Sequence, residues 1–115
     1  MSRRMPAAVR TAFEAELRKA RRSATSEQRW AALERAHILS QPWPWPHTQA
    51  HGVMLRAAWR DRDRRETIGQ FVRLLVAAPG SALGRYPEGN TGRATVPLMA
   101  PMPLPTDLAE ILADR

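Results

Sequence analysis

Apolar residues recur three or four positions apart in four consecutive segments of the chain, which predicts four amphipathic helices. The first runs from about Pro6 to Ser23 and the second from Ser26 to Gln41. Thr25 precedes Gln28 by three residues, which is the pattern of a capping box at a helix start. The first third of the chain is therefore expected to form a helical hairpin.

A second hairpin is predicted to follow. Pro46 suits the first turn of a helix that extends to about Arg62, and Asp63 with Glu66 forms another capping-box pattern. The fourth helix is expected to bury an apolar face made of Ile68, Phe71, Val72 and Leu75. Pro79-Gly80 predicts the end of this helix.

Residues 80–105 differ in character, because closely spaced prolines and glycines disfavour a long helix or a central strand. Large apolar residues in this segment favour an ordered arm across the bundle over a flexible tail. These expected anchors are Val96, Leu98, Met99, Met102 and Leu104. Thr106 caps a short terminal helix within residues 106–115. We expect an all-α single domain, residues 1–115, with a four-helix core over residues 1–79.

The two hairpins are expected to pack as a four-helix bundle or as a tetratricopeptide-like pair. A weak internal repeat at an offset of 38 residues supports stacking. It aligns Trp30 with Ile68, and it places His37 and His51 at positions that are apolar in the other hairpin. These histidines therefore occupy positions expected in the core.

Composition narrows the class of protein. A chain of 115 residues with 43% hydrophobic and 25% charged residues is ordinary for one folded domain. It has no cysteine, which excludes disulfides and thiolate sites. We find no targeting segment and no apolar run of membrane-spanning length, so the expected location is the cytoplasm.

The formal net charge of +7 has two interpretations. Basic side chains attract phosphates, as in nucleic-acid binding. Alternatively, a preference for arginine, with Lys19 as the one lysine, reflects the coding bias of a GC-rich genome. Arginines and acidic residues alternate between Arg56 and Glu66, which favours a solvated ion-pair surface over a nucleic-acid surface with Trp59 as a stacking platform.

The strongest candidate site lies in ERAHILSQPWPWPHTQAHGVML, residues 34–55, which contains all three histidines. Glu34 and His37 are three residues apart on one helix face, and His47 and His51 are four apart on the next helix. The Pro-Trp-Pro-Trp-Pro linker separates the two helices. An antiparallel hairpin would bring His37 toward His47.

This pattern predicts a metal site with His37, His47 and His51 as ligands and Glu34 as a ligand or a supporting partner. Imidazole and carboxylate groups suit zinc, iron, nickel or copper. A single Glu-x-x-His motif favours a mononuclear site, because carboxylate-bridged di-iron proteins need two such motifs and further glutamates. Buried histidines that only form hydrogen bonds are the alternative.

A second candidate site lies around PEGNTGR, residues 87–93. Flexible glycines beside arginines suit anion binding, with Arg85, Asn90, Thr91 and Arg93 as the candidate residues. A plain turn, in which Asn90 and Thr91 bond to the local backbone, is favoured over the anion site. The segment lacks the Gly-Lys-Ser/Thr of a Walker loop.

The stretches FEAELRKAR, LERAHILSQ, HTQAHGVML and GNTGRATVPLMAPMPLPTDL together resemble a small bacterial family of about 110 residues known only as a domain of unknown function. The resemblance extends from Phe13 to Leu112 and implies no catalytic residue. Our first functional hypothesis is a metal-binding protein, either an accessory protein of metal stress or a mononuclear metalloenzyme. The alternative is a metal-free helical adaptor that binds a protein, or less readily a nucleic acid, through its groove or arginine-rich surface.

Overall fold

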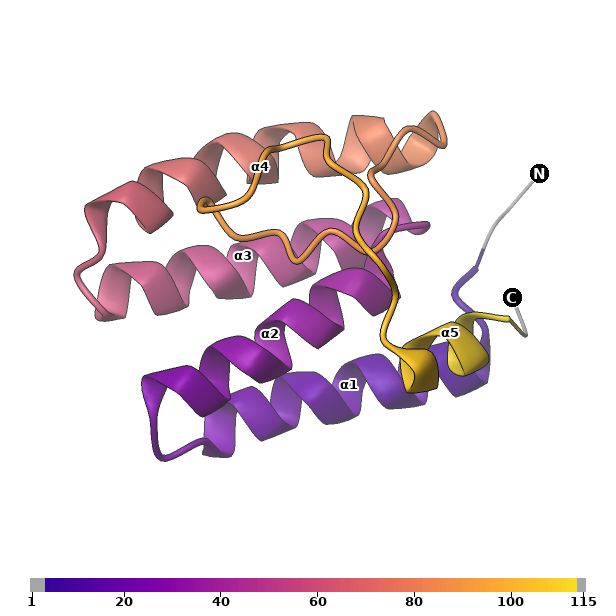
Figure 1. Cartoon of the computed structure of the whole chain (residues 1–115), viewed down its shortest axis with the longest axis horizontal. Helices are drawn as coiled ribbons and strands as arrows, with labels where there is room; N and C mark the ends of the chain where they lie inside the picture. Colours follow the sequence, from indigo (N-terminus) through magenta and orange to yellow (C-terminus); the bar gives the residue numbers. More distant parts are fainter. Residues whose placement is uncertain (1–3, 114–115) are drawn as a thin grey trace.

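The computed structural model describes residues 4–113, and within this range it contains five α-helices and no β-strand (Figure 1). The helices are α1 (Ala7–Arg22), α2 (Ser26–Ser40), α3 (Pro44–Arg60), α4 (Arg64–Ala82) and α5 (Thr106–Leu112). The predicted all-α class, with two helical hairpins and a short terminal helix, is confirmed. None of the described helices is long and apolar enough to cross a membrane.

The helices lie side by side in the order of the chain (Figure 1). α1 packs against α2, α2 against α3, and α3 against α4, so α1 and α4 lie at opposite ends of the row. α5 packs on α1 and α2. Arg35 of α2 supports this packing, because its Nε donates to Glu16 at 2.8 Å and its Nη2 pairs with Asp107.

Both predicted capping boxes supply an acceptor to the first turn of a helix. Thr25 Oγ1 accepts from the Gln28 amide at 3.1 Å, and Asp63 Oδ1 accepts from the Glu66 amide at 3.0 Å. Each bond satisfies an amide that has no partner within its helix. α3 begins at Pro44, earlier than predicted, because a proline in the first turn costs no helical hydrogen bond.

The predicted helix end at Pro79-Gly80 is wrong, since α4 continues to Ala82 with Pro79 inside it. The Pro79 carbonyl accepts from the Leu83 amide at 3.0 Å, and the Gly80 carbonyl accepts from the Arg85 amide at 2.8 Å. These bonds keep the last turn closed although proline itself has no amide hydrogen to donate.

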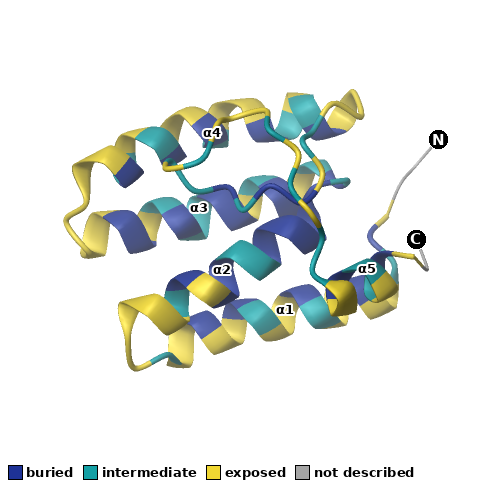
Figure 2. Ribbon diagram, viewed as in Figure 1, coloured by how far each residue is buried: buried dark blue, intermediate teal, exposed yellow. Residues whose placement is uncertain are grey.

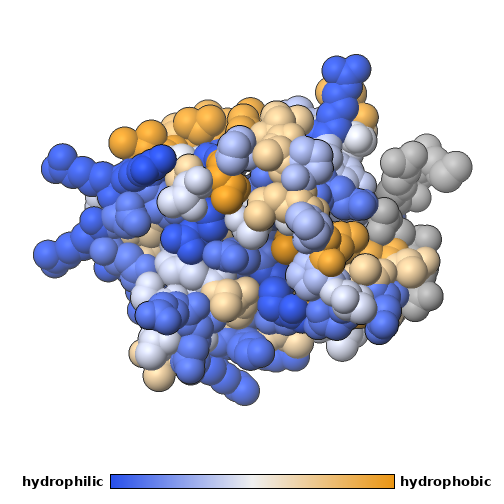
Figure 3. Space-filling view, in the orientation of Figure 1, coloured by the Kyte–Doolittle hydropathy of each residue, from blue (hydrophilic) through white to orange (hydrophobic). Residues whose placement is uncertain are grey.

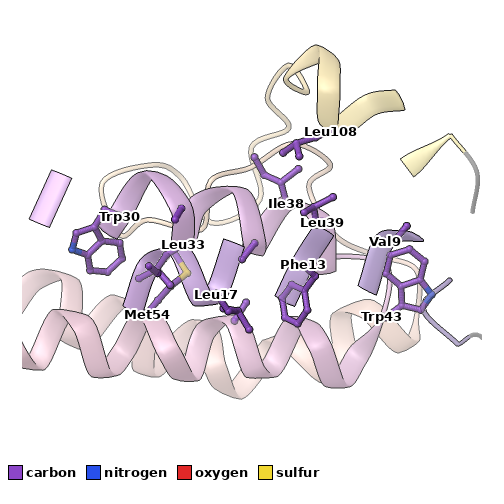
Figure 4. Packing of buried hydrophobic residues seen from close by; sticks show 14 of the residues in the cluster. Val9, Phe13, Leu17, Trp30, Leu33, Ile38, Leu39, Trp43, Met54 and Leu108 are labelled. Atoms are coloured by element: carbon purple, nitrogen blue, oxygen red, sulfur yellow. The ribbon is translucent and has the colours of Figure 1, made fainter. Parts of the chain in front are cut away.

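The apolar core lies among α1, α2, α3 and α5 (Figure 4). Its largest fully buried apolar side chains are Val9, Phe13, Leu33, Leu39, Met54 and Leu108. Full burial of such a side chain stabilises the fold by about 1.5–3 kcal/mol. The predicted first hairpin thus carries most of the hydrophobic stabilisation.

The buried face predicted for α4 is wrong. Ile68 is 66% exposed, Phe71 53% and Leu75 64%, so this stripe faces outward (Figures 2 and 3). The repeat alignment fails at the same place, because Trp30 is buried while its counterpart Ile68 is exposed. The buried residues of α4 are Glu66, Gln70, Arg73, Ala77 and Ser81.

Residues 83–105 form an ordered arm that runs over α3 and α4 before it reaches α5 (Figure 1). Asn90 Nδ2 holds the arm together by donating to the Pro97 and Ala100 carbonyls at 3.0 and 2.8 Å. Gly89 has φ +82°, and a Cβ there would lie 1.9 Å from the Met102 carbonyl oxygen, so only glycine fits. Of the expected anchors, Leu98 and Met99 are exposed, and Val96, Met102 and Leu104 are half-buried.

Candidate metal centre

The three histidines meet where α2 ends and α3 begins. His37 lies in the last turn of α2, and His47 and His51 lie on successive turns of α3. His47 Nε2 is 3.1 Å from His37 Nε2 and 3.2 Å from His51 Nε2. All three side chains are buried, so the hairpin brings together a histidine triad in the interior of the protein, defined here as His37, His47 and His51.

Each ring of the triad turns its other nitrogen, Nδ1, outward to an oxygen. His37 Nδ1 lies 2.8 Å from the Asn90 carbonyl oxygen, and His51 Nδ1 lies 2.7 Å from Gln70 Oε1. His47 Nδ1 lies 2.7 Å from Ser81 Oγ. A carbonyl oxygen can only accept, so the proton of the His37 ring is on Nδ1.

The partners of Gln70 and Ser81 assign the other two protons. Gln70 Nε2 donates to Glu66 Oε2 and to the Gly92 carbonyl, both at 2.7 Å, which leaves Gln70 Oε1 to accept from His51. Ser81 Oγ donates its one hydrogen to the Gln41 carbonyl at 2.5 Å, so it accepts from His47. All three rings therefore carry the proton on Nδ1.

The consequence is that three unprotonated Nε2 atoms face one another. Two such nitrogens cannot hydrogen-bond to each other, because neither has a proton to donate. A tetrahedral zinc site with bonds of about 2.0–2.1 Å places its nitrogen ligands about 3.3–3.4 Å apart. Two of the three separations in the triad, 3.1 and 3.2 Å, are close to this value, and all three ligand atoms lie within 4.8 Å of one another. The triad has the geometry and the lone pairs to hold a metal ion.

Burial keeps the triad neutral. Burial, together with the neighbouring His51, lowers the pKa of His47 to about 3, and burial lowers the pKa of His51 to about 4. Burial also holds the pKa of His37 well below its usual value, as do the other two imidazoles. Neutral imidazole is the form that binds metals, so burial keeps the triad in the protonation state that metal binding would require.

A buried carboxylate supports the triad from behind. Glu66 Oε2 accepts from Gln70 and from the Ala94 amide, and Glu66 Oε1 accepts from Arg93 Nε at 3.0 Å. Gln70 in turn orients His51. Glu66 therefore holds the Gln70 amide in place, and Gln70 holds the His51 imidazole in place. Metal-binding histidines commonly have outer support of this kind.

The PEGNTGR segment forms one wall of the site. Gly92 has φ +84°, and a Cβ there would lie 2.7 Å from Cδ2 of His37, so the glycine lets the backbone lie against the ring. Gln41, at the end of α2, holds this segment by donating to the Pro87 carbonyl at 2.9 Å and accepting from the Gly89 amide at 3.1 Å. The arm and the hairpin thus build the site together.

Glu34 lies outside the triad. Its Oε2 accepts from Arg93 Nη1 at 3.1 Å. Arg93 also pairs with Glu66, and its guanidinium carbon lies 4.0 Å from the ring centre of Trp30. Two carboxylates therefore share the charge of Arg93, which the sequence made a candidate for anion binding while favouring a plain turn there.

The other anion candidates make separate contacts. Asn90 is buried and braces the arm, and Thr91 Oγ1 accepts from the Arg93 amide at 3.5 Å in a local turn. Arg85 is exposed and lines the pocket beside the triad. Of the four candidate residues, Arg85 and Asn90 line this pocket, and Thr91 and Arg93 are not part of its lining.

A pocket of about 310 Å³ opens beside the triad, and all three histidines line it. Two arginines, Arg73 and Arg85, also line this pocket. Its apolar lining includes Val76, Ala77, Leu83, Leu98 and Met99. A metal held by the triad would therefore lie next to space for a second ligand.

Sequence reasoning missed the contribution of α4. Glu66, Gln70, Arg73 and Ser81 recur at helical spacing within an otherwise apolar segment. A polar stripe in an apolar helix is the signal that could have identified them, because such a stripe must face either water or a polar site. Here it faces the histidines.

Comparisons with known proteins agree with the resemblance seen in the sequence. A family model described as "Protein of unknown function (DUF3703)" matches residues 7–112, so the chain belongs to this family. Searches among curated proteins and among solved structures gave no significant match.

Proposed function

We propose that this member of the family binds one divalent transition metal ion through His37, His47 and His51. The observation that carries the proposal is the convergence of three unprotonated Nε2 atoms, each oriented by an acceptor on its own Nδ1. Without a cation these lone pairs repel one another in a buried site. A metal ion removes this repulsion.

Three neutral nitrogen ligands suit zinc, iron, nickel or copper. Structural zinc sites usually have four protein ligands, whereas catalytic sites commonly have three and leave one position open. Three histidine ligands would correspond to the second arrangement, and the pocket lined by all three supports this part of the proposal. We propose a cytoplasmic metal-binding protein that also accepts a second ligand, as an accessory protein of metal stress or a metalloenzyme would.

Glu34 has a supporting role in this proposal. It binds Arg93, which binds Glu66, and Glu66 binds the Gln70 amide that orients His51. Outer partners of this kind orient the ligands and adjust the affinity for the metal. The ligand set of the proposal is therefore the triad, with Glu34 at the far end of its support.

Isothermal titration of zinc into purified metal-free protein tests the proposal. The wild type should bind one ion per chain, and His47→Ala and His51→Ala should each bind at least 100-fold more weakly. Gln49→Ala is the matched control, because Gln49 lies on α3 between the two histidines and is exposed. It should bind zinc as the wild type does.

Nickel, copper and iron should be titrated in the same way, because the ligands alone do not select one metal. Absence of stoichiometric binding of all four metals to the wild type would contradict the proposal. Equal affinity of the wild type and the two histidine variants would also contradict it.

The outer face of α4 favours a second candidate function, a helical adaptor. Ile68, Phe71, Val72 and Leu75 are all more than 40% exposed on neighbouring turns. A contiguous apolar face of this kind often marks a protein contact, and a second copy of the chain is the simplest partner with a matching face. Sedimentation of the wild type and of Phe71→Ser over a range of concentrations tests this, because self-association should weaken in the variant.

A further inference from the structure

We propose that the pocket beside the triad binds an organic carboxylate with a compact apolar body. This inference rests on the proposed metal site and names the class of its second ligand. It depends on Arg73, a residue to which neither the sequence patterns nor the metal proposal gives a role.

Within residues 4–113, Arg73 is a buried cation with no carboxylate at salt-bridge distance, and Glu66 acts on it only through a longer-range charge interaction. Arg73 is 9% exposed, and its guanidinium donates to the Gly69 carbonyl at 3.2 Å and the Val96 carbonyl at 2.9 Å. An arginine has five N–H donors, so part of its donor capacity remains for another acceptor. Buried charges are usually paired, which makes this arginine an unusual feature of the interior.

The nearby carboxylates are used elsewhere. Glu66 binds Arg93, the Gln70 amide and the Ala94 amide, and Glu34 binds Arg93 as well. Arg73 lines the same pocket as the three histidines, so its charge lies close to the triad. Because the three ligands are neutral, a bound divalent ion would leave this part of the interior with a strong excess of positive charge.

The pocket matches an anion that has an apolar portion. Arg73 and the triad line it together, and Arg85 adds a second cation. Much of the remaining lining is apolar, contributed by the second half of α4 and by the arm. A volume of about 310 Å³ is at the small end of ligand pockets, which suits a molecule the size of hexanoate or benzoate.

A carboxylate suits both the proposed metal ion and the Arg73 guanidinium. Carboxylate oxygens are ligands for zinc and related metals, and a guanidinium binds carboxylates through charge-assisted hydrogen bonds. The apolar body of the ligand would pack against the apolar side chains of the pocket, and its removal from water would increase the binding affinity. Neutral molecules of the same shape would leave the excess positive charge uncompensated.

The experiment uses zinc-loaded protein and measures dissociation constants by calorimetry, with a cobalt-loaded sample for the visible spectrum. Hexanoate is the main probe, hexanamide tests the need for charge, and acetate tests the need for the apolar body. Hexanoate should bind at least 10-fold more tightly than either comparison molecule. It should also change the cobalt spectrum, because it enters the coordination sphere.

Arg73→Gln should weaken hexanoate binding at least 10-fold while zinc affinity stays equal or rises, since a like charge is removed. Arg64→Gln is the matched control, because Arg64 is an exposed arginine on the same helix. It should behave as the wild type. If Arg73→Gln fails to fold, Arg73→Lys keeps the charge and should retain hexanoate binding in preference to hexanamide.

Failure of this inference can be told apart from failure of the metal proposal. If the wild type binds zinc but does not prefer hexanoate to hexanamide and acetate, the carboxylate inference alone is overturned. Unchanged hexanoate affinity in Arg73→Gln would also overturn it. If the wild type binds none of the metals, both proposals are overturned.

Discussion

The two hairpins have the same architecture and opposite interiors. Between α1 and α2 the buried residues are apolar, with Phe13, Leu17 and Leu33 among them (Figure 4). Between α3 and α4 the buried residues include two histidines, Gln70 and Glu66. Apolar side chains exclude water from the α1–α2 interface, whereas the α3–α4 interface contains a network of hydrogen bonds.

The difference shows what a polar interior requires. Apolar burial is non-directional and needs only matching shape, whereas every buried polar group needs a partner in the correct position. In the part of the chain that the structure describes, each Nδ1 of the triad has an oxygen partner, whereas the three Nε2 atoms have only one another. The polar interface therefore depends on precise positions in the arm as well as in the helices.

Acid should produce the largest effect, and it should act on the polar interface. Between pH 6.5 and the lowered native pKa values of His47 and His51, the unfolded chain binds more protons than the native protein. The free energy of unfolding should therefore fall as pH falls below 6.5, by up to about 1.4 kcal/mol per pH unit for each histidine. Urea unfolding of metal-free protein at pH 7, 6 and 5 measures this slope.

Zinc provides the control for the acid experiment. A bound metal competes with protons for the imidazoles, so saturating zinc should move the loss of stability to lower pH. The carboxyl group of Asp61 has a lowered pKa because Trp30 donates a hydrogen bond to it, so it titrates below this range. A free energy of unfolding that stays constant from pH 7 to pH 5 in metal-free protein would contradict the prediction.

Phe13→Ala should have the next largest effect, and it tests the apolar interface. Phe13 is 1% exposed, and truncation of a buried phenylalanine typically costs about 3–5 kcal/mol. Urea unfolding should show this loss at every pH, with the pH slope of the wild type retained. A pH slope that differs from that of the wild type would show that the apolar and polar interfaces are energetically coupled.

Gln70→Ala should have a smaller effect on stability and a specific effect on metal binding. It removes the acceptor for His51 Nδ1 and leaves the Glu66 carboxylate with one donor fewer, which costs about 1–3 kcal/mol. Zinc affinity should fall about 10–100-fold, as is typical when an outer partner of a metal ligand is lost. Calorimetry with Gln49→Ala as control checks this, and unchanged zinc affinity would show that Gln70 does not orient His51 for binding.

Phe71→Ser should have the smallest effect on the folded chain. Phe71 is 53% exposed on the outer face of α4, and surface substitutions usually change stability by less than about 0.5 kcal/mol. Chemical unfolding at low protein concentration measures this without a contribution from self-association. A loss above 2 kcal/mol would place Phe71 in a core, as the sequence pattern had predicted.

The sequence by itself determined the helices and the place where the histidines meet. Capping residues and apolar spacing located the starts of α2 and α4, and the short proline-rich linker placed His37 beside His47. These are local features, decided by backbone sterics and by hydrogen bonds within a few residues. That is why they could be read before the fold was known.

Only the tertiary structure decided which face of α4 is buried and how the triad is supported. A prediction from periodicity assumes that the apolar stripe of a helix faces inward. In α4 the polar stripe faces inward instead, because the buried histidines need Gln70 and Ser81 as hydrogen-bond partners. The Asn90 carbonyl reaches His37 from 53 residues away. Such contacts depend on the packing of distant segments, which local pattern does not encode.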